Sequence, residues 1–141
     1  TQEGKMIKAM VMLLALAVLT NGCSSANLLS QLTGNEWNVT SLLGKTLNPS
    51  DGLKGLPTIN FTEDGKLFGS TGCNNFVGSF KLEGSSLSLD PGAITKMFCP
   101  DSPEQDFLTA VKQVTDFKMD GTALNLLNGS NPVISLLPKS K

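Results

Sequence analysis

The chain has 141 residues, about one domain with a short extension, and eleven lysines against twelve acidic residues give it a formal charge of −1. It contains no histidine, arginine or tyrosine. The balanced charge provides no electrostatic basis for binding nucleic acid. The lack of histidine excludes Ser-His-Asp machinery, a cysteine nucleophile with a histidine base, and most zinc sites.

Residues 1–22 are predicted to be a signal peptide. Two lysines precede the apolar run 9–20, which has the length of a signal-peptide core and is too short to span a bilayer comfortably. Residues 1–5 are interpreted as a cloning remnant. The segment ends with Gly22 and Cys23, which resembles the bacterial lipobox. The alternatives are an ordinary signal peptide cleaved elsewhere or a buried helix.

Cys23 is predicted to be the lipidated first residue of the mature protein. Its acyl chains, palmitate among them, would hold the protein on a membrane through about 0.8 kcal/mol per buried methylene. Residues 23–33 are expected to be a short lipidated tether. The serine after the cysteine is typical of lipoproteins sent to the outer membrane. We therefore expect the protein in the cell envelope, on the outer membrane and facing the periplasm.

Eight short apolar stretches separated by turn signals follow, and each is predicted to be a β-strand. The pair Asp64-Gly65 between two of them is a strong hairpin signal. A further apolar stretch, 93–98, leads into Cys99, and 44–57 is the long loop of the chain. The predicted strands are 36–43, 57–62, 67–71, 76–83, 87–90, 115–119, 122–128 and 132–137.

The segment 102–114 has the periodicity of an amphipathic helix, with Phe107 and Val114 on its apolar face. Ser102 and Gln105 predict a capping box at its start. A helix with one apolar face needs a surface to cover. The predicted fold is therefore mainly β (α+β), a small antiparallel curled sheet or barrel of about eight short strands with this helix packed on it. A single domain is expected over residues 34–141.

The stretch GSTGCNNFVGSF, residues 69–80, places Cys73 among glycines and asparagines. A cysteine there has three interpretations: nucleophile, metal ligand, or half of a disulfide. Catalysis lacks a histidine base, and a zinc site built on Cys73 and Cys99 would need two carboxylates as well. If Cys23 is lipidated, two cysteines remain in an oxidising compartment, which favours a bridge.

Four other residues are candidates for either a structural or a ligand-facing role. Trp37 is more often a core residue than a ligand platform when it lies in a strand. Gly72 marks unusual backbone geometry. Asn74 and Asn75 either satisfy backbone groups at that kink or line a polar ligand site, and the first interpretation is favoured. The sequence has no P-loop, GxGxxG or GxSxG motif, so we expect no cofactor and no metal.

A carboxylate-based enzyme is the remaining catalytic hypothesis. Its candidate residues are Asp101, Glu104 and Asp106, which lie close together in sequence. Acidic residues at a helix start also stabilise the helix through its dipole, and this structural interpretation is favoured. We therefore expect that the protein is not an enzyme.

Five short motifs lie between about residue 34 and the end of the chain. They are WNV at Trp37, PTINF at Pro57, GKLFGSTGCNNFVGSF from Gly65, TKMFC ending at Cys99, and EQDFLTAV at Glu104. Together they resemble the META domain of the HslJ-like heat-shock lipoproteins. The resemblance implies a small barrel-like β fold with one helix, an envelope protein linked to stress and antibiotic tolerance, and no established catalytic residues. With this resemblance, Cys73 and Cys99 are predicted to form a disulfide.

We therefore expect a non-enzymatic envelope lipoprotein that acts in stress or antibiotic tolerance through structural or protein-interaction roles. We expect a monomer that is held on a membrane by its lipid anchor. The partner expected for it is another protein of the envelope. The alternative is a lipocalin-like carrier of a small apolar ligand. An interior filled by its aromatic residues, Trp37, Phe61, Phe80 and Phe107, would leave no room for a ligand, whereas a cavity of about 300 Å³ or more would favour a carrier.

Overall fold

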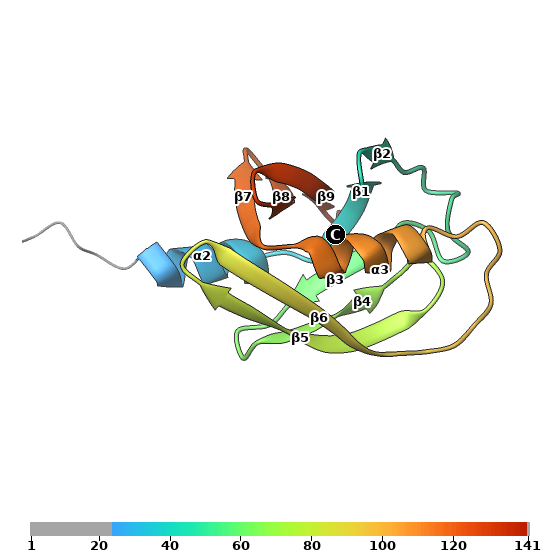
Figure 1. Ribbon diagram of the computed structural model, residues 1–141, viewed down its shortest axis with the longest axis horizontal. Helices are drawn as coiled ribbons and strands as arrows, with labels where there is room; N and C mark the ends of the chain where they lie inside the picture. The colour runs from blue at the N-terminus through green and yellow to red at the C-terminus, as the bar shows by residue number, and fades with distance from the viewer. Residues whose placement is uncertain (1–23, 141) are drawn as a thin grey trace, which may run out of the picture.

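Within residues 24–140, nine antiparallel strands form one sheet that curls until its ends meet, and two helices pack on it (Figure 1). The structure is a computed structural model that describes residues 24–140. Its helices are α2 (Ser24–Thr33) and α3 (Glu104–Gln113). Within these residues, neither helix is long and apolar enough to cross a membrane. The strands are β1 (Trp37–Leu42), β2 (Lys45–Thr46), β3 (Thr58–Phe61), β4 (Lys66–Ser70), β5 (Asn75–Glu83), β6 (Ser86–Ile94), β7 (Asp116–Asp120), β8 (Ala123–Asn128) and β9 (Asn131–Pro138).

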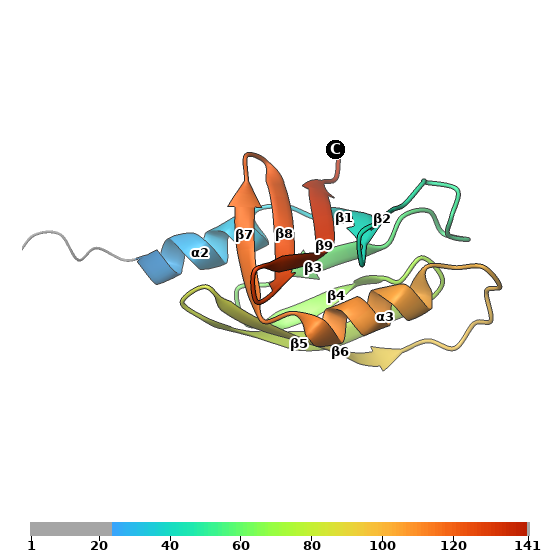
Figure 2. The same ribbon diagram turned by 45° about the horizontal axis from the view of Figure 1, so that its top comes forward.

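The sheet closes into a ring because β1 pairs with β9 on one side and with β3 on the other. The seam between β6 and β7 is much narrower than its neighbours. One register pair, Ser86 with Asp116, joins these two strands, and the Leu87 N–H donates to the Thr115 carbonyl at 2.9 Å. β6 therefore separates from β7 along most of its length. Helix α3 connects the two strands and lies along the opening between them (Figure 2).

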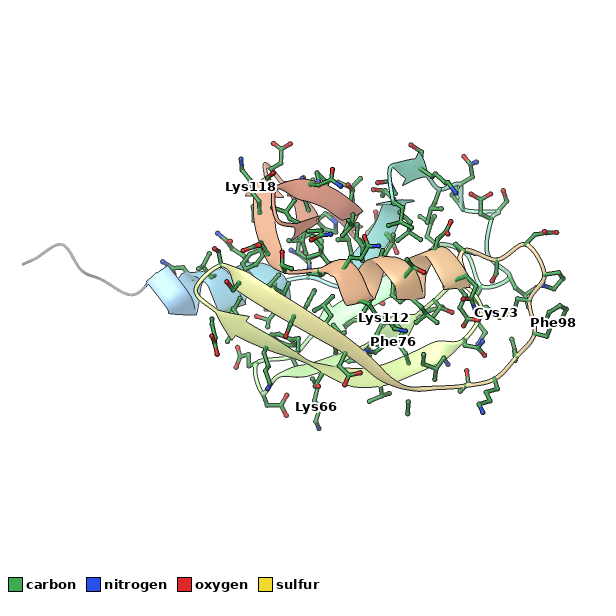
Figure 3. The ribbon with its side chains drawn as sticks, viewed as in Figure 1. Lys66, Cys73, Phe76, Phe98, Lys112 and Lys118 are labelled. Atoms are coloured by element: carbon green, nitrogen blue, oxygen red, sulfur yellow. A yellow bond between two sulfur atoms is a disulfide. The ribbon has the colours of Figure 1, made fainter. Side chains whose placement is uncertain are left out.

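Helix α3 covers the opening with its apolar face. Phe107, Ala110 and Val111 are buried, and their spacing places them on one side of the helix. The Phe107 ring centroid lies 5.4 Å from that of Phe76 on β5, which Figure 3 labels below the helix. The predicted amphipathic helix thus completes the core of the ring.

The predicted capping box at the start of this helix is wrong. Pro103 is the N-cap residue, and no side chain caps the helix. Because the helix begins one residue later than predicted, Gln105 is the second helical residue and not the third, where a capping-box side chain reaches back. Ser102 instead accepts a long hydrogen bond, 3.4 Å, from the Glu104 N–H.

Apolar side chains fill the interior of the ring. Trp37 and Phe107 are fully buried, and Phe61 and Phe80 are 4% and 7% exposed. The Phe61 and Phe80 rings meet edge to face with their centroids 5.2 Å apart. The Trp37 indole N–H donates to the Leu32 carbonyl at 2.9 Å, so the polar atom of the largest core residue is also satisfied. Aromatic side chains therefore occupy the interior of the ring.

Residues 24–33 form helix α2 where a tether was expected. Leu32 is fully buried, and Leu28 and Leu29 pack against the core. The three leucines are spaced as one face of a helix, but the segment is too short for a clear periodic signal. The predicted lipidation residue Cys23 and the predicted signal peptide 1–22 lie outside the described residues.

The eight predicted strands each overlap an observed strand. The ninth, β2, has two residues within the predicted long loop and pairs with β1 through Ser41–Thr46 and Leu42–Lys45. The apolar stretch 93–98 is only partly in the sheet. Its first two residues end β6, which continues to Ile94, and the rest belongs to the loop that follows. The fold is mainly β, as predicted.

We predict that Leu32→Ala lowers the free energy of unfolding by about 2–5 kcal/mol, because it opens a cavity beneath α2. Urea unfolding of the full-length, non-acylated chain would measure the change. Gln31→Ala is the matched control, since Gln31 is exposed on the same helix and its removal should change stability by less than about 0.5 kcal/mol. Equal stability of the two variants would show that α2 does not belong to the core.

Candidate functional site

The turn between β4 and β5 packs directly against the start of α3. Gly72 has a φ of +91°, a conformation that glycine adopts without strain. A Cβ atom at this position would lie 2.9 Å from the Pro103 Cγ, so a side chain would also collide with the start of the helix. The Gly72 carbonyl accepts a hydrogen bond from the Lys54 N–H at 3.2 Å. Gly72 therefore lets three segments come together.

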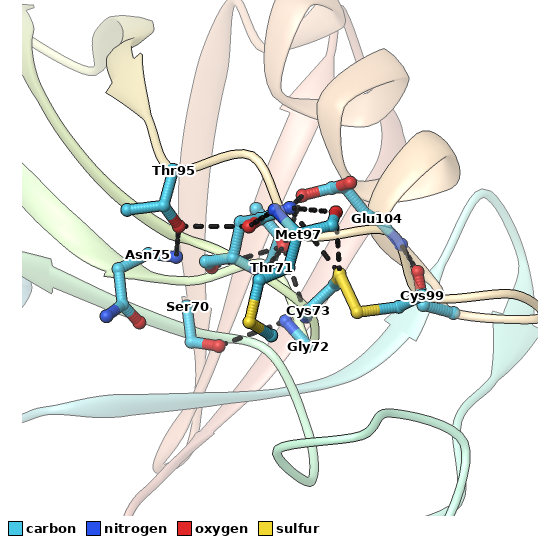
Figure 4. Close-up of a disulfide and its surroundings, with 11 residues drawn as sticks. Ser70, Thr71, Gly72, Cys73, Asn75, Thr95, Met97, Cys99 and Glu104 are labelled. Carbon is cyan, nitrogen blue, oxygen red and sulfur yellow. Dashed lines mark hydrogen bonds between the residues drawn. A yellow bond between two sulfur atoms is a disulfide. The ribbon is translucent and has the colours of Figure 1, made fainter.

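A disulfide between Cys73 and Cys99 joins this turn to the loop 95–101 that follows β6 (Figure 4). Cys73 is fully buried, and the two Cα atoms are 5.9 Å apart. The bridge links residues separated by 26 positions. A sulfur held in such a bond is neither a free nucleophile nor a metal ligand, so the residue has a structural role in this state.

Asn74 holds the loop 95–101 from the inside. Its side chain is 2% exposed. Its Oδ1 accepts from the Met97 N–H at 2.6 Å and from the Thr95 hydroxyl at 2.9 Å. Its Nδ2 donates to the Met97 carbonyl at 3.1 Å and to Glu104 Oε1 at 2.8 Å. Both amide atoms are therefore used within the protein, although Asn74 also borders a shallow hollow of about 320 Å³ on the surface.

Glu104 connects the same cluster to α3. Its Oε1 accepts from the Thr71 hydroxyl at 2.8 Å as well as from Asn74. Thr71 is fully buried, and its Oγ1 accepts from the N–H groups of Cys73 and Asn74 at 3.2 and 2.9 Å. No buried side-chain nitrogen or oxygen in the described part of the chain lacks a hydrogen-bond partner. The cluster is a self-satisfied polar network beside a hydrophobic core.

The other residues singled out from the sequence do not join this network through their side chains. Asn75 is exposed, and its backbone N–H donates to the Thr95 hydroxyl at 3.0 Å. Trp37 lies in the core on β1. The structure therefore separates the two neighbouring asparagines, with Asn74 inside and Asn75 outside.

The three carboxylates proposed for catalysis have separate surroundings. Glu104 accepts the hydrogen bonds described above, and Asp106 pairs with Lys45 at 3.6 Å on the surface. Asp101 is exposed in the loop 95–101 and has a φ of +61°. Glu104 and Asp106 therefore each contact another element of the fold.

Thr71, Thr95 and Glu104 are the network residues whose contacts sequence reasoning missed. The spacing of Thr71 and Asn74 is typical of a side chain that bonds the backbone of a turn, and this signal was available. The contacts of Thr95 and Glu104 depend on residues 21 and 30 positions away, which no local pattern reveals.

We predict that replacing both Cys73 and Cys99 by serine lowers the free energy of unfolding by about 3–4 kcal/mol, because the unfolded chain loses a closed loop of about 27 residues. Urea unfolding under oxidising conditions would measure this loss, with Cys23→Ser as the matched control that should unfold like the parent chain. Intact-mass analysis of the exported, unreduced protein after alkylation provides the second check. Alkylation of both Cys73 and Cys99 would contradict the assignment.

We also predict that Asn74→Ala lowers the free energy of unfolding by about 2–4 kcal/mol, because it leaves buried partners of the amide without hydrogen bonds. Asn75→Ala is the adjacent control and should change stability by less than about 0.5 kcal/mol. Thermal unfolding with the disulfide intact separates the two effects. A similar loss in both variants would contradict the assignment of the hub to Asn74.

Comparison with known proteins places this arrangement in a family. No curated protein matches the chain. A protein solved by NMR is 25% identical with a TM-score of 0.60, over 78% of this chain and 93% of its own. An NMR structure from Burkholderia xenovorans is 18% identical with a TM-score of 0.60, over 88% and 94%. A crystal structure of a DUF4847 family protein from Bacteroides vulgatus is 18% identical with a TM-score of 0.56, over 78% and 96%.

The two structures at 18% identity share the fold of this chain. The family model for the META domain matches residues 30–141, which include the end of α2, the whole ring, α3 and the Cys73–Cys99 cluster. The chain therefore belongs to the META domain family.

Proposed function

We propose that the protein is a non-enzymatic lipoprotein of the cell envelope, anchored through Cys23 to the outer membrane on its periplasmic side. It contributes to tolerance of heat or of envelope-active antibiotics through a structural or protein-interaction role. The META domain supports this proposal at the level of the family. The lipobox-like end of the apolar run 9–20 supports the anchor.

The observation that carries the proposal is that the buried polar side chains among residues 24–140 all have hydrogen-bond partners within the protein. Thr71, Asn74 and Glu104 bond one another beside the core, and no group of three or more cysteine or acidic side chains in the described part of the chain has the arrangement of a metal site. Buried groups that satisfy one another stabilise a fold and are poorly placed to act on a substrate. Interaction through the surface is the role that this arrangement supports.

The alternative, a carrier of a small apolar ligand, receives no support from the interior. Trp37 and Phe107 are fully buried and Phe61 is 4% exposed, so aromatic rings occupy the space that a ligand would need. The Trp37 N–H is also taken by the Leu32 carbonyl. We therefore do not advance the carrier hypothesis.

Helix α2 adds a geometric consequence to the proposed anchor. Cys23 directly precedes Ser24, the first residue of α2, and Leu32 fixes the helix in the core. The proposed lipid would then be attached directly to a helix that packs on the core, with no flexible linker between the two. The α2 end of the molecule, at the left of Figure 1, would face the membrane, with the loops around the disulfide at the opposite end.

We predict that deletion of the gene leaves growth normal but lowers survival at raised temperature or in an envelope-active antibiotic. Plasmid-borne parent protein should restore survival, whereas Cys23→Ser should leave the protein in the soluble periplasmic fraction and restore survival poorly. Membrane fractionation and survival counts measure the two effects. Unchanged survival of the deletion strain under every such stress would count against the stress role, and membrane retention of Cys23→Ser would count against the anchor.

A further inference from the structure

Three apolar side chains are exposed at the end of the molecule that lies opposite α2. Phe98 is 91% exposed, Leu53 is 72% exposed and Met97 is 44% exposed. Figure 3 shows Phe98 pointing away from the domain on the loop 95–101. An isolated exposed apolar residue is ordinary on a protein surface, but Phe98 and Leu53 line the same hollow.

The loop that carries Phe98 is fixed on both sides of this residue. On one side, Asn74 binds both the N–H and the carbonyl of Met97. On the other side, the disulfide fixes Cys99. A buried amide and a covalent bridge therefore hold the backbone that presents an exposed phenyl ring. A side chain presented on a fixed backbone loses less conformational freedom when it binds, which favours affinity.

The loop that carries Leu53 is held against the same cluster. The Lys54 N–H donates to the Gly72 carbonyl at 3.2 Å, and the Asn48 N–H donates to Asp51 Oδ2 at 2.6 Å. The two loops border an open hollow of about 730 Å³. The hollow is therefore bounded by two anchored segments.

The charge of the hollow is negative. Asp51 and Asp101 are among its lining residues, and no lysine is. Neither carboxylate forms an ion pair with a lysine among residues 24–140. A partner with a cation beside an apolar group would complement both the carboxylates and the exposed apolar side chains of the hollow.

We propose that this hollow is a docking site for a segment of another protein that carries an apolar side chain next to lysine or arginine. The apolar side chain contacts Phe98 and Leu53, and the cation lies near Asp51 and Asp101. The inference rests on the proposed interaction role and names the surface and the partner chemistry for it. A two-fold contact between two copies through this hollow is disfavoured because it would bring the same carboxylates together, and an anionic membrane is disfavoured because it would repel them.

The test is a titration of the full-length, isotope-labelled, non-acylated chain followed by NMR amide shifts. The probes are three peptides: acetyl-Lys-Leu-Lys-amide, acetyl-Glu-Leu-Glu-amide and acetyl-Lys-Ser-Lys-amide. We expect saturable shifts in both loops with the first peptide at a Kd of about 1 mM, and at least about fivefold weaker binding of the other two. No saturable shift below about 10 mM, or equal binding of the three peptides, would overturn the proposal.

Single substitutions show whether peptide binding depends on the hollow or on any exposed apolar side chain. Phe98→Ala should weaken binding at least about fivefold, whereas Phe68→Ala, which removes a 43% exposed phenyl ring on β4, should not. Asp101→Asn keeps a side chain that tolerates the positive φ, and it should reduce binding and its salt dependence. Equal binding by Phe98→Ala and the parent chain would overturn the assignment. Thermal unfolding would verify that each variant is folded.

Two further measurements test whether a membrane or a second copy of the chain occupies the hollow instead. Phe98-dependent binding to phosphatidylcholine vesicles, or Phe98-dependent dimers in sedimentation, would each overturn the proposal. The titration is independent of the survival measurement on the deletion strain. A failed titration with a clear survival defect rejects the docking site alone, and a clear titration without a survival defect rejects the stress role alone.

Discussion

The hydrogen bonds that Glu104 accepts from Thr71 and Asn74 are the contact on which the arrangement of the domain depends. They fix the start of α3 on the turn between β4 and β5. Helix α3 must be in place because β6 and β7 meet at one register pair and leave the ring open beside it. A short-range polar contact thus positions the element that closes a hydrophobic core. Gly72 permits the close approach that this contact requires.

The same cluster shows how far the sequence could predict the structure. Alternating apolar residues and turn signals indicated the strands, because both are local properties. The short helix α2 and the bonds of Asn74 to Met97 were not predicted, because they depend on which segments the folded ring brings together. Asn74 and Asn75 are identical in type and adjacent in sequence, yet one is inside and one is outside. Asn74 lies in the bend that precedes β5, whereas Asn75 is the first residue of that strand.

The interior of the molecule is closed and packed, whereas its loops are anchored and carry exposed side chains. This difference indicates where the molecule can make contacts. The core residues are selected for packing, and Trp37 even satisfies its N–H within the fold. The loops beside the disulfide instead combine firm backbone attachment with exposed apolar side chains such as Phe98. Such a distribution is typical of a rigid scaffold that carries its interactions on its connecting segments.

The pairing of β1 with β9 joins the first and last strands of the ring, and the Thr40 hydroxyl reaches the Ser135 carbonyl across 95 positions of sequence. Contacts between such distant residues form late, since a long segment must be ordered before they are made. A chain that crosses a membrane with its N-terminus first would keep β1 without its last partner until β9 had also crossed. If the chain is exported as proposed, the ring would close only after β9 had crossed, and the edge of β1 that pairs with β9 would stay unpaired in the interval.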